Sequence, residues 1–247
     1  MPAHRNGPVS SNVSRHRNQH LHPMSRTAAL YRILSFEHLV DLFESRSLYF
    51  SSPRNWEDPF EKILVHRRSA AIFAQCWCKK AVSDAMWRIY SENKMSVRIK
   101  THVIQLSAQL HRARGAEELI NFRTHDVEYL ATNELSKKLK AIAEDLDISF
   151  TSYRAADALL IKREAFDHEA EVRVVVHDNK WQEGDSQKNH LRISIDPHSL
   201  IESVYFDPRA SDRYIEVCSY FLKQKLQFKG AVGKSGLYRT QSELIIE

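Results

Sequence analysis

Two glutamates and an arginine lie close together late in the chain, in the segment Glu-Ala-Glu-Val-Arg at 169–173. Alternating apolar residues predict a strand over 170–177. Because alternate residues of a strand share a face, Glu169, Glu171 and Arg173 would lie together on the face away from the core, with neighbours roughly 6–7 Å apart. Two carboxylates at that separation can divide labour: one stabilises a developing cation while the other orients or deprotonates a nucleophile. A solvent-facing strand edge with a Glu–Arg ion pair is the competing interpretation.

A second polar cluster lies in a predicted loop over 52–60, which contains two prolines. One interpretation is structural: Asp58 caps a helix start, Pro59 occupies its first turn and Glu61 completes a capping box. The other is catalytic. With the two glutamates of the first cluster, Asp58 and Glu61 would supply oxygen ligands to Mg²⁺ in a metal-dependent nuclease or hydrolase, and Lys162 would act beside them.

A third cluster is aromatic. Trp87 and Tyr90 lie one turn apart on a predicted helix that Ser83 caps. Core packing explains such a pair. The alternative is that Trp56, Trp87 and Tyr90 form the pocket of a non-catalytic module that binds a ligand or a partner.

The chain has three cysteines, namely Cys76, Cys78 and Cys218. This odd, sparse count argues against a disulfide framework and is typical of a reducing compartment, so a cytoplasmic protein is expected. On a predicted strand, Cys76 and Cys78 would point to the same face. No second Cys/His pair follows at zinc spacing, so we expect buried structural cysteines and no metal site.

The net charge of +5 is concentrated at the start of the chain. Residues 1–26 hold four arginines and no acidic residue, which leaves the remainder close to neutral. We therefore expect a disordered basic tail over 1–27, with Met24 as an alternative start, and nucleic-acid contact through this tail only. No apolar stretch approaches the roughly 20 residues of a membrane span, so no membrane contact is expected.

The remaining pattern predicts a single α+β domain over 28–247. Strands are expected at 29–34, 48–51, 72–77, 97–103, 127–130, 170–177, 191–195 and 199–206. Helices are expected after Ser35 and after Ser83, and at 105–114, 133–145, 155–162 and 211–225. Because helices and strands do not alternate strictly, the expected architecture is a mixed or mostly antiparallel sheet flanked by helices.

The same clusters occur together in one family. Over roughly residues 29–240 the sequence resembles the domain of unknown function 2971, a bacterial family with no settled activity. The matching motifs are Leu30-Tyr31-Arg32, Leu48-Tyr49-Phe50-Ser51-Ser52-Pro53, Asp58-Pro59-Phe60-Glu61, Cys76-Trp77-Cys78, Ala85-Met86-Trp87-Arg88-Ile89-Tyr90, and Lys162 ahead of Phe166-Asp167-His168-Glu169-Ala170-Glu171-Val172-Arg173. Two departures are the insertion of Trp56-Glu57 after Asn55 and the absence of the usual glycine near 93–96. The shared order favours one composite site.

A weaker resemblance bears on chemistry. Tyr31-Arg32 on the first strand, the aromatic helix and the late-strand Glu-x-Glu are similar to the ADP-ribosyltransferase pattern. This resemblance implies that Arg32 anchors NAD, that Glu171 stabilises the oxocarbenium-like transition state, and that Glu169 positions the acceptor. Further NAD-contacting residues would be Tyr31, Ser51, Trp87 and Tyr90, with Asp58, Glu61, Lys162 and Arg173 around them and Thr151-Ser152 in place of a middle-strand motif.

The resemblance thus implies an NAD-using ADP-ribosyltransferase-like enzyme, of the kind found among bacterial toxins and phage-defence effectors, with a macromolecular acceptor that the sequence does not identify. Such a site needs a cationic clamp for the dinucleotide and a buried carboxylate for the ribosyl cation. The deciding geometry is whether Arg32 and Glu171 lie across one cleft.

Overall fold

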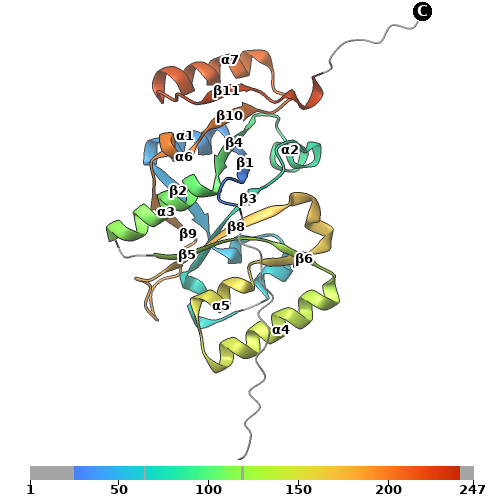
Figure 1. Cartoon of the computed structure of the whole chain (residues 1–247), viewed down its shortest axis with the longest axis vertical. Coiled ribbons are helices and arrows are strands. Elements are labelled where there is room, and N and C mark those ends of the chain that lie inside the picture. Colours follow the sequence, from blue (N-terminus) through green and yellow to red (C-terminus); the bar gives the residue numbers. More distant parts are fainter. Residues whose placement is uncertain (1–24, 64, 118–119, 240–247) are drawn as a thin grey trace, which may run out of the picture.

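The computed structural model describes residues 25–63, 65–117 and 120–239 (Figure 1). Residues 1–24 of the tail predicted over 1–27, and with them the alternative start at Met24, lie outside the described residues. Within the described part of the chain, no helix combines the length and the apolar composition needed to cross a membrane.

Nine of the described strands form one mostly antiparallel sheet, which confirms the predicted α+β class. Along its main path the order is β11 (Ala231–Lys234), β10 (Ser203–Phe206), β4 (Ser96–His102), β1 (Ala29–Ser35), β3 (Ile72–Cys78), β2 (Ser47–Ser51) and β9 (His190–Ser194). Off this path, β8 (Glu171–Asp178) pairs with β3 and with β5 (Ile120–Asp126). In this sheet only β10 and β11 pair in parallel. A separate parallel pair joins β6 (Glu128–Leu130) and β7 (Ile161–Arg163).

The sheet divides at β3. One edge of β3 pairs with β8 over seven residues. Its other edge is shared, because β2 pairs at Ala74 and β1 pairs at Cys78, with one register pair each. By contrast, β1 pairs with β4 along its whole length. Beside Cys76, therefore, neither β1 nor β2 pairs with β3, and the sheet opens between β1 and β3 at that point.

Helices flank the sheet and also cover the two ends of the molecule (Figure 1). They are α1 (Phe36–Ser45), α2 (Asp84–Tyr90), α3 (Val103–Glu117), α4 (Thr132–Ile148), α5 (Ser152–Asp157), α6 (Pro197–Leu200) and α7 (Asp212–Tyr220). At one end, α7 lies beside β11 and continues as a π-helical turn over Phe221–Lys225; at the other, α4 and α5 lie together. The predicted caps are present: Ser35 Oγ accepts from His38 N at 3.2 Å and Ser83 Oγ from Met86 N at 3.3 Å.

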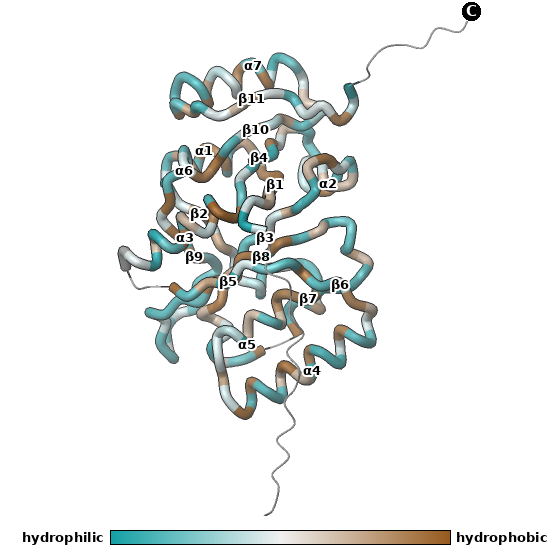
Figure 2. Tube along the Cα trace, viewed as in Figure 1, coloured by the Kyte–Doolittle hydropathy of each residue, from teal (hydrophilic) through white to brown (hydrophobic). Residues whose placement is uncertain are grey.

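Two apolar clusters flank β8, because its residues alternate between them. Val172, Val174 and Val176 join the larger core with Phe50 and Trp77. Val175 faces a second cluster that α4 contributes to through four buried residues, Leu135, Leu139, Ile142 and Leu146. Figure 2 shows the apolar stripe of α4 turned toward the rest of the molecule. The face of β8 predicted to meet solvent is therefore covered.

Three element predictions are corrected. The helix predicted at 155–162 ends at Asp157, and residues 161–163 form β7 instead. The strand predicted at 199–206 begins at Ser203, after α6. Strand β5 was not predicted, because its residues are mostly polar; it forms because β8 offers a buried partner over seven residues.

Candidate functional site

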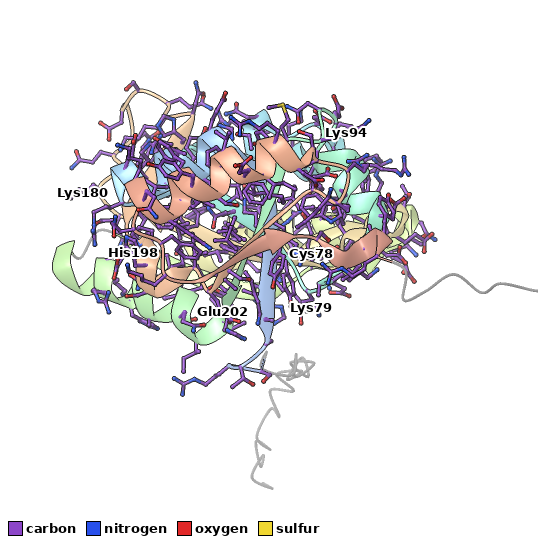
Figure 3. The ribbon with its side chains drawn as sticks, turned by 90° about the horizontal axis from the view of Figure 1, so that it is seen from above. Cys78, Lys79, Lys94, Lys180, His198 and Glu202 are labelled. Carbon is purple, nitrogen blue, oxygen red and sulfur yellow. The ribbon has the colours of Figure 1, made fainter. Side chains whose placement is uncertain are left out.

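A cavity of about 180 Å³ opens where β1 and β3 part. Consecutive residues of both strands line it, together with the aromatic face of α2. The lining residues are Tyr31, Arg32, Ile33, Cys76, Trp77, Cys78, Lys80, Ala81, Ser83, Met86, Trp87, Tyr90, Arg98 and Glu171. Cys78 and its neighbour Lys79 are labelled in Figure 3. The structure therefore brings five of the predicted residues to one cavity: Tyr31, Arg32, Trp87, Tyr90 and Glu171.

Glu171 is the acidic side chain of this cavity. It begins β8, and its backbone N–H donates to the Tyr129 hydroxyl at 2.8 Å. The carboxylate is buried, and its contacts converge on Oε2: Arg173 donates from Nε at 3.0 Å and from Nη2 at 2.5 Å, and Lys162 Nζ lies 3.7 Å away. Among the described residues no donor reaches Oε1. One oxygen is thus held by the protein while the other stays available to a ligand.

Glu169 does not lie on the strand as predicted. It ends a 3₁₀ helix over Glu164–Glu169, and Ala170 follows with a left-handed backbone at φ 44°. This turn places Glu169 beside the Lys162 ammonium, with which it forms a buried ion pair. The Tyr90 hydroxyl donates to Glu169 Oε1 at 3.4 Å. Burial, and then the charges of Glu169 and Glu171, raise the pKa of Tyr90, so its hydroxyl remains a donor.

The left-handed turn gives a testable stability effect. A left-handed backbone costs a residue with a Cβ about 1–2 kcal/mol, and glycine escapes most of that cost. Ala170→Gly should therefore leave the free energy of unfolding unchanged or raise it by up to about 1 kcal/mol, because added unfolded-state entropy offsets part of the gain. Ala170→Val should lower it by roughly 1–3 kcal/mol. Urea unfolding measures both changes.

Ala108, exposed within α3, supplies the matched control. Ala108→Gly should cost about 1 kcal/mol, as usual for glycine inside a helix. An equal loss in Ala170→Gly would contradict the importance of this turn.

Arg173 joins the carboxylates behind the cavity. Its side chain is 1% exposed and donates to Glu61, to Glu171 and to the carbonyl of Leu159, the last at 2.9 Å. The indole of Trp56 lies under the guanidinium, 4.6 Å from ring centroid to Cζ. Burial alone would lower the pKa of Arg173, but Cys76, Glu171 and Glu61 raise it. The prediction of a solvent-facing strand edge is therefore wrong at this position.

The loop around Asp58 supplies two further carboxylates, which pair with arginines. Asp58 Oδ1 accepts from Phe60 N at 3.0 Å, so the predicted cap is present, and it also accepts from Arg163 at 2.9 Å. The predicted capping box is wrong, because the Glu61 carboxylate turns inward to Arg173. Burial raises the pKa of Glu61 despite that partner. We call these residues, Asp58, Glu61, Lys162, Glu169 and Arg173, the support layer.

Two arginines at the cavity lack the partners that Arg173 has. No carboxylate of the described residues lies within ion-pairing distance of Arg32 or Arg98, and burial lowers the pKa of both. Arg32 is half-buried, and its charge interacts with Cys76 and Tyr90. Sequence reasoning missed Arg98, since an arginine that alternates with buried Val97 and Ile99 resembles any outward-facing residue. Its absent counter-charge is visible only in three dimensions.

The family profile described as protein of unknown function (DUF2971) matches residues 86–174. The resemblance to this family is confirmed. The DUF2971 segment runs from α2 into β8, which is narrower than the span expected from the motifs. It includes Tyr90, Arg98 and Glu171, whereas Arg32 and the Asp58 loop precede it.

Comparison with solved structures gave distant similarities to Thermus sp. 2.9 DarT. The complex with NAD⁺ has a TM-score of 0.40 and 14% identity, over 85% of this chain and 96% of that chain. The carba-NAD⁺ complex has a TM-score of 0.37 and 13% identity over the same shares, and the complex with ADP-ribosylated ssDNA 0.40 and 14% over 85% and 94%. None of the curated proteins compared matches the chain. At these scores the chemistry has to be derived from the side chains of this chain.

The carboxylates of the DUF2971 segment and of the Asp58 loop meet, as the metal hypothesis requires, but around cations. Lys162 and Arg173 lie between Glu61, Glu169 and Glu171, and Arg163 holds Asp58. The described residues contain no group of three or more His, Cys, Asp or Glu side chains that could hold a metal ion. The arrangement therefore favours a carboxylate held by cations over an oxygen-ligand metal site.

Two further predictions fall outside the cavity. Ser51 is not among its lining residues; it accepts from Trp56 Nε1 at 2.9 Å and so fixes the indole under Arg173. Thr151 caps α5, accepting from Arg154 N at 3.1 Å, so Thr151-Ser152 lies on no middle strand.

The paired cysteines behave as predicted from their spacing. Cys76 and Cys78 lie on one face of β3, opposite Arg173 and Glu171 of the neighbouring strand. Burial raises the pKa of Cys76 to about 12 and also raises that of Cys78. Both thiols therefore stay protonated near neutral pH, which suits cavity walls rather than nucleophiles.

Proposed function

We propose that this chain is an NAD-using, ADP-ribosyltransferase-like enzyme whose substrate binds in the cavity between Arg32 and Glu171. The observation that carries the proposal is their placement: an arginine without a carboxylate partner and a carboxylate with one free oxygen line the same cavity. An unpaired guanidinium suits an anionic dinucleotide, and an oriented carboxylate suits a ribosyl cation.

The chemistry assigned to the cavity is glycosidic transfer. The bond between the ribose anomeric carbon and the nicotinamide nitrogen breaks, and nicotinamide leaves with the electron pair. Positive charge develops on the ribose, where Glu171 Oε1 stabilises it. The acceptor then bonds to the anomeric carbon and loses its proton, so that ADP-ribosylated acceptor, nicotinamide and a proton are the products.

The support layer gives Glu171 a fixed charge and direction. A buried carboxylate needs a cationic partner, and Arg173 holds Oε2 with two donors while Lys162 lies 3.7 Å away. Lys162 also pairs with Glu169, which Tyr90 connects to the cavity wall. Glu169, the residue assigned to the acceptor side, would therefore act through Tyr90, which lines the cavity.

The size of the cavity limits what it can enclose. At about 180 Å³ it is smaller than the roughly 300–1,000 Å³ of typical ligand pockets. It can therefore enclose part of a dinucleotide, and we assign it the nicotinamide ribose and adjacent phosphates. Trp87 and Tyr90 would pack against the adjoining nicotinamide ring.

Nicotinamide release tests the proposal directly. Purified protein is incubated with NAD and separate acceptor pools of protein, DNA and RNA, and free nicotinamide and labelled acceptor are measured. Arg32→Gln should raise the KM for NAD by roughly tenfold or more, because a charge-assisted contact contributes about 1.5–3 kcal/mol. Absence of NAD cleavage with every pool would exclude the proposed reaction.

Arg88→Gln is the matched control, since Arg88 lies on the exposed side of α2 and pairs with Asp84 at 2.7 Å. It should leave the KM within about twofold of the original, as expected for an exposed ion pair.

A toxin or phage-defence role in bacteria is part of the same proposal. Growth arrest on induced expression, and its loss in a Glu171→Gln variant, measures it.

A further inference from the structure

Arg98 is held in an unusual environment on β4. Its guanidinium stacks against two tyrosines of the neighbouring strands, with Cζ 5.1 Å from the Tyr31 ring centroid and 5.6 Å from that of Tyr205. The strand register explains this, because Arg98 pairs with Ile33 of β1 and with Tyr205 of β10. The two rings flank the guanidinium, and the same residue lines the cavity.

Two of the three guanidinium nitrogens of Arg98 lack a hydrogen-bond partner among the described residues. These two atoms, Nε and Nη1, are buried. A buried charged donor without an acceptor carries a large desolvation penalty, so such groups are normally paired. The Glu202 carboxylate serves other cations: it pairs with Lys100 at 2.6 Å and contacts His102 at 3.0 Å.

The side chains that line the cavity carry an excess of positive charge. Its charged side chains are Arg32, Lys80, Arg98 and Glu171, three cations and one anion. Arg98 lies on the same face of the sheet as Tyr31 and Ile33, and the alternation along β1 puts Arg32 on the opposite face. The two arginines therefore form different parts of the cavity wall and can contact two separate anionic groups.

We propose that Arg98 is a phosphate-binding residue, clamped by Tyr31 and Tyr205, and that together with Arg32 it makes this cavity specific for organic diphosphates. The planar edge of a guanidinium matches a phosphate with two parallel hydrogen bonds. That the diphosphate belongs to NAD rests on the proposed function; that an anion binds at Arg98 does not.

Direct binding to the full chain tests this inference. ADP-ribose, inorganic pyrophosphate and uncharged nicotinamide are titrated by calorimetry. Arg98→Gln should weaken ADP-ribose and pyrophosphate binding by roughly 10- to 100-fold, the range for a lost charge-assisted contact, and leave nicotinamide binding within about twofold. Tm should not fall in the absence of ligand, because the variant removes an unpaired buried charge.

Lys100→Gln is the control, since Lys100 lies on the same strand and face and pairs with Glu202, labelled in Figure 3. It should bind all three probes as the original chain does. Unchanged ADP-ribose affinity in Arg98→Gln, or no binding of either phosphate probe to the original chain, overturns the inference. If phosphate binding depends on Arg98 but the protein cleaves no NAD, the inference about Arg98 holds and the proposed reaction is excluded. If the protein cleaves NAD and Arg98→Gln leaves the KM unchanged, the proposed reaction holds and the inference about Arg98 is overturned.

Discussion

Glu171→Gln should reduce NAD cleavage by roughly 100- to 1,000-fold while the protein stays folded. The amide keeps the size of the side chain but removes the negative charge that faces the developing ribosyl cation, and losses of this kind cost about 2.7–4 kcal/mol of transition-state stabilisation. Nicotinamide release at saturating NAD measures the effect on kcat. Glutamine retains an oxygen that can accept from Arg173, so ADP-ribose binding should change by less than about tenfold.

The control is Glu128→Gln, because Glu128 is also ion-paired, with Lys138, but lies on β6 away from the cavity lining. Its turnover should stay within about twofold of the original, as expected for an exposed pair. Turnover near the original level in Glu171→Gln, with Tm unchanged, would show that the carboxylate does not act on the ribose.

Arg173→Ala should lower the free energy of unfolding by about 3–5 kcal/mol. The substitution leaves Glu61 and Glu171 buried without the cation that contacts both of them. It also removes the group that packs on the Trp56 indole and donates to the Leu159 carbonyl. Urea unfolding measures the loss. Arg213→Ala, which removes an exposed pair with Glu216, should change stability by less than about 0.5 kcal/mol.

The loss in Arg173→Ala should depend on pH. Burial already raises the pKa of Glu61, and Arg173 opposes that rise, so its removal raises the pKa further. A carboxyl with a raised pKa binds more protons in the folded state than in the unfolded state, so stability falls as pH rises through that range. The destabilisation should therefore be smaller at pH 5 than at pH 8. An equal or larger loss at pH 5 would contradict the assignment of buried, unpaired carboxylates.

Much of the local structure could be predicted from the residues alone. The caps at Ser35, Ser83 and Asp58 each depend on a hydrogen bond to a backbone amide two or three positions away, so the necessary information lies within one turn. The amphipathic pattern of α4 and the apolar alternation of β8 likewise reflect neighbours along the chain. Strand β5 and the end of α5 were missed because pairing with a distant partner decided them.

The candidate site was also predicted only in part. The family resemblance grouped Arg32, Tyr90 and Glu171, and the structure places all three on one cavity. The alternating pattern of the sequence placed Glu169 on the strand, whereas in the structure the left-handed Ala170 turns Glu169 toward Lys162. Because a period of two assumes regular backbone, one left-handed residue is enough to break it.

The sequence by itself determined the chemistry present: carboxylates, guanidiniums and aromatic rings in an order typical of one site, on elements whose types follow from local periodicity. Only the tertiary structure decided which of those groups have partners. Arg173 meets Glu61 across 112 residues of chain, while Arg98 meets no carboxylate among the described residues. Whether a charge is paired depends on sheet order and on the opening between β1 and β3, which no local pattern encodes.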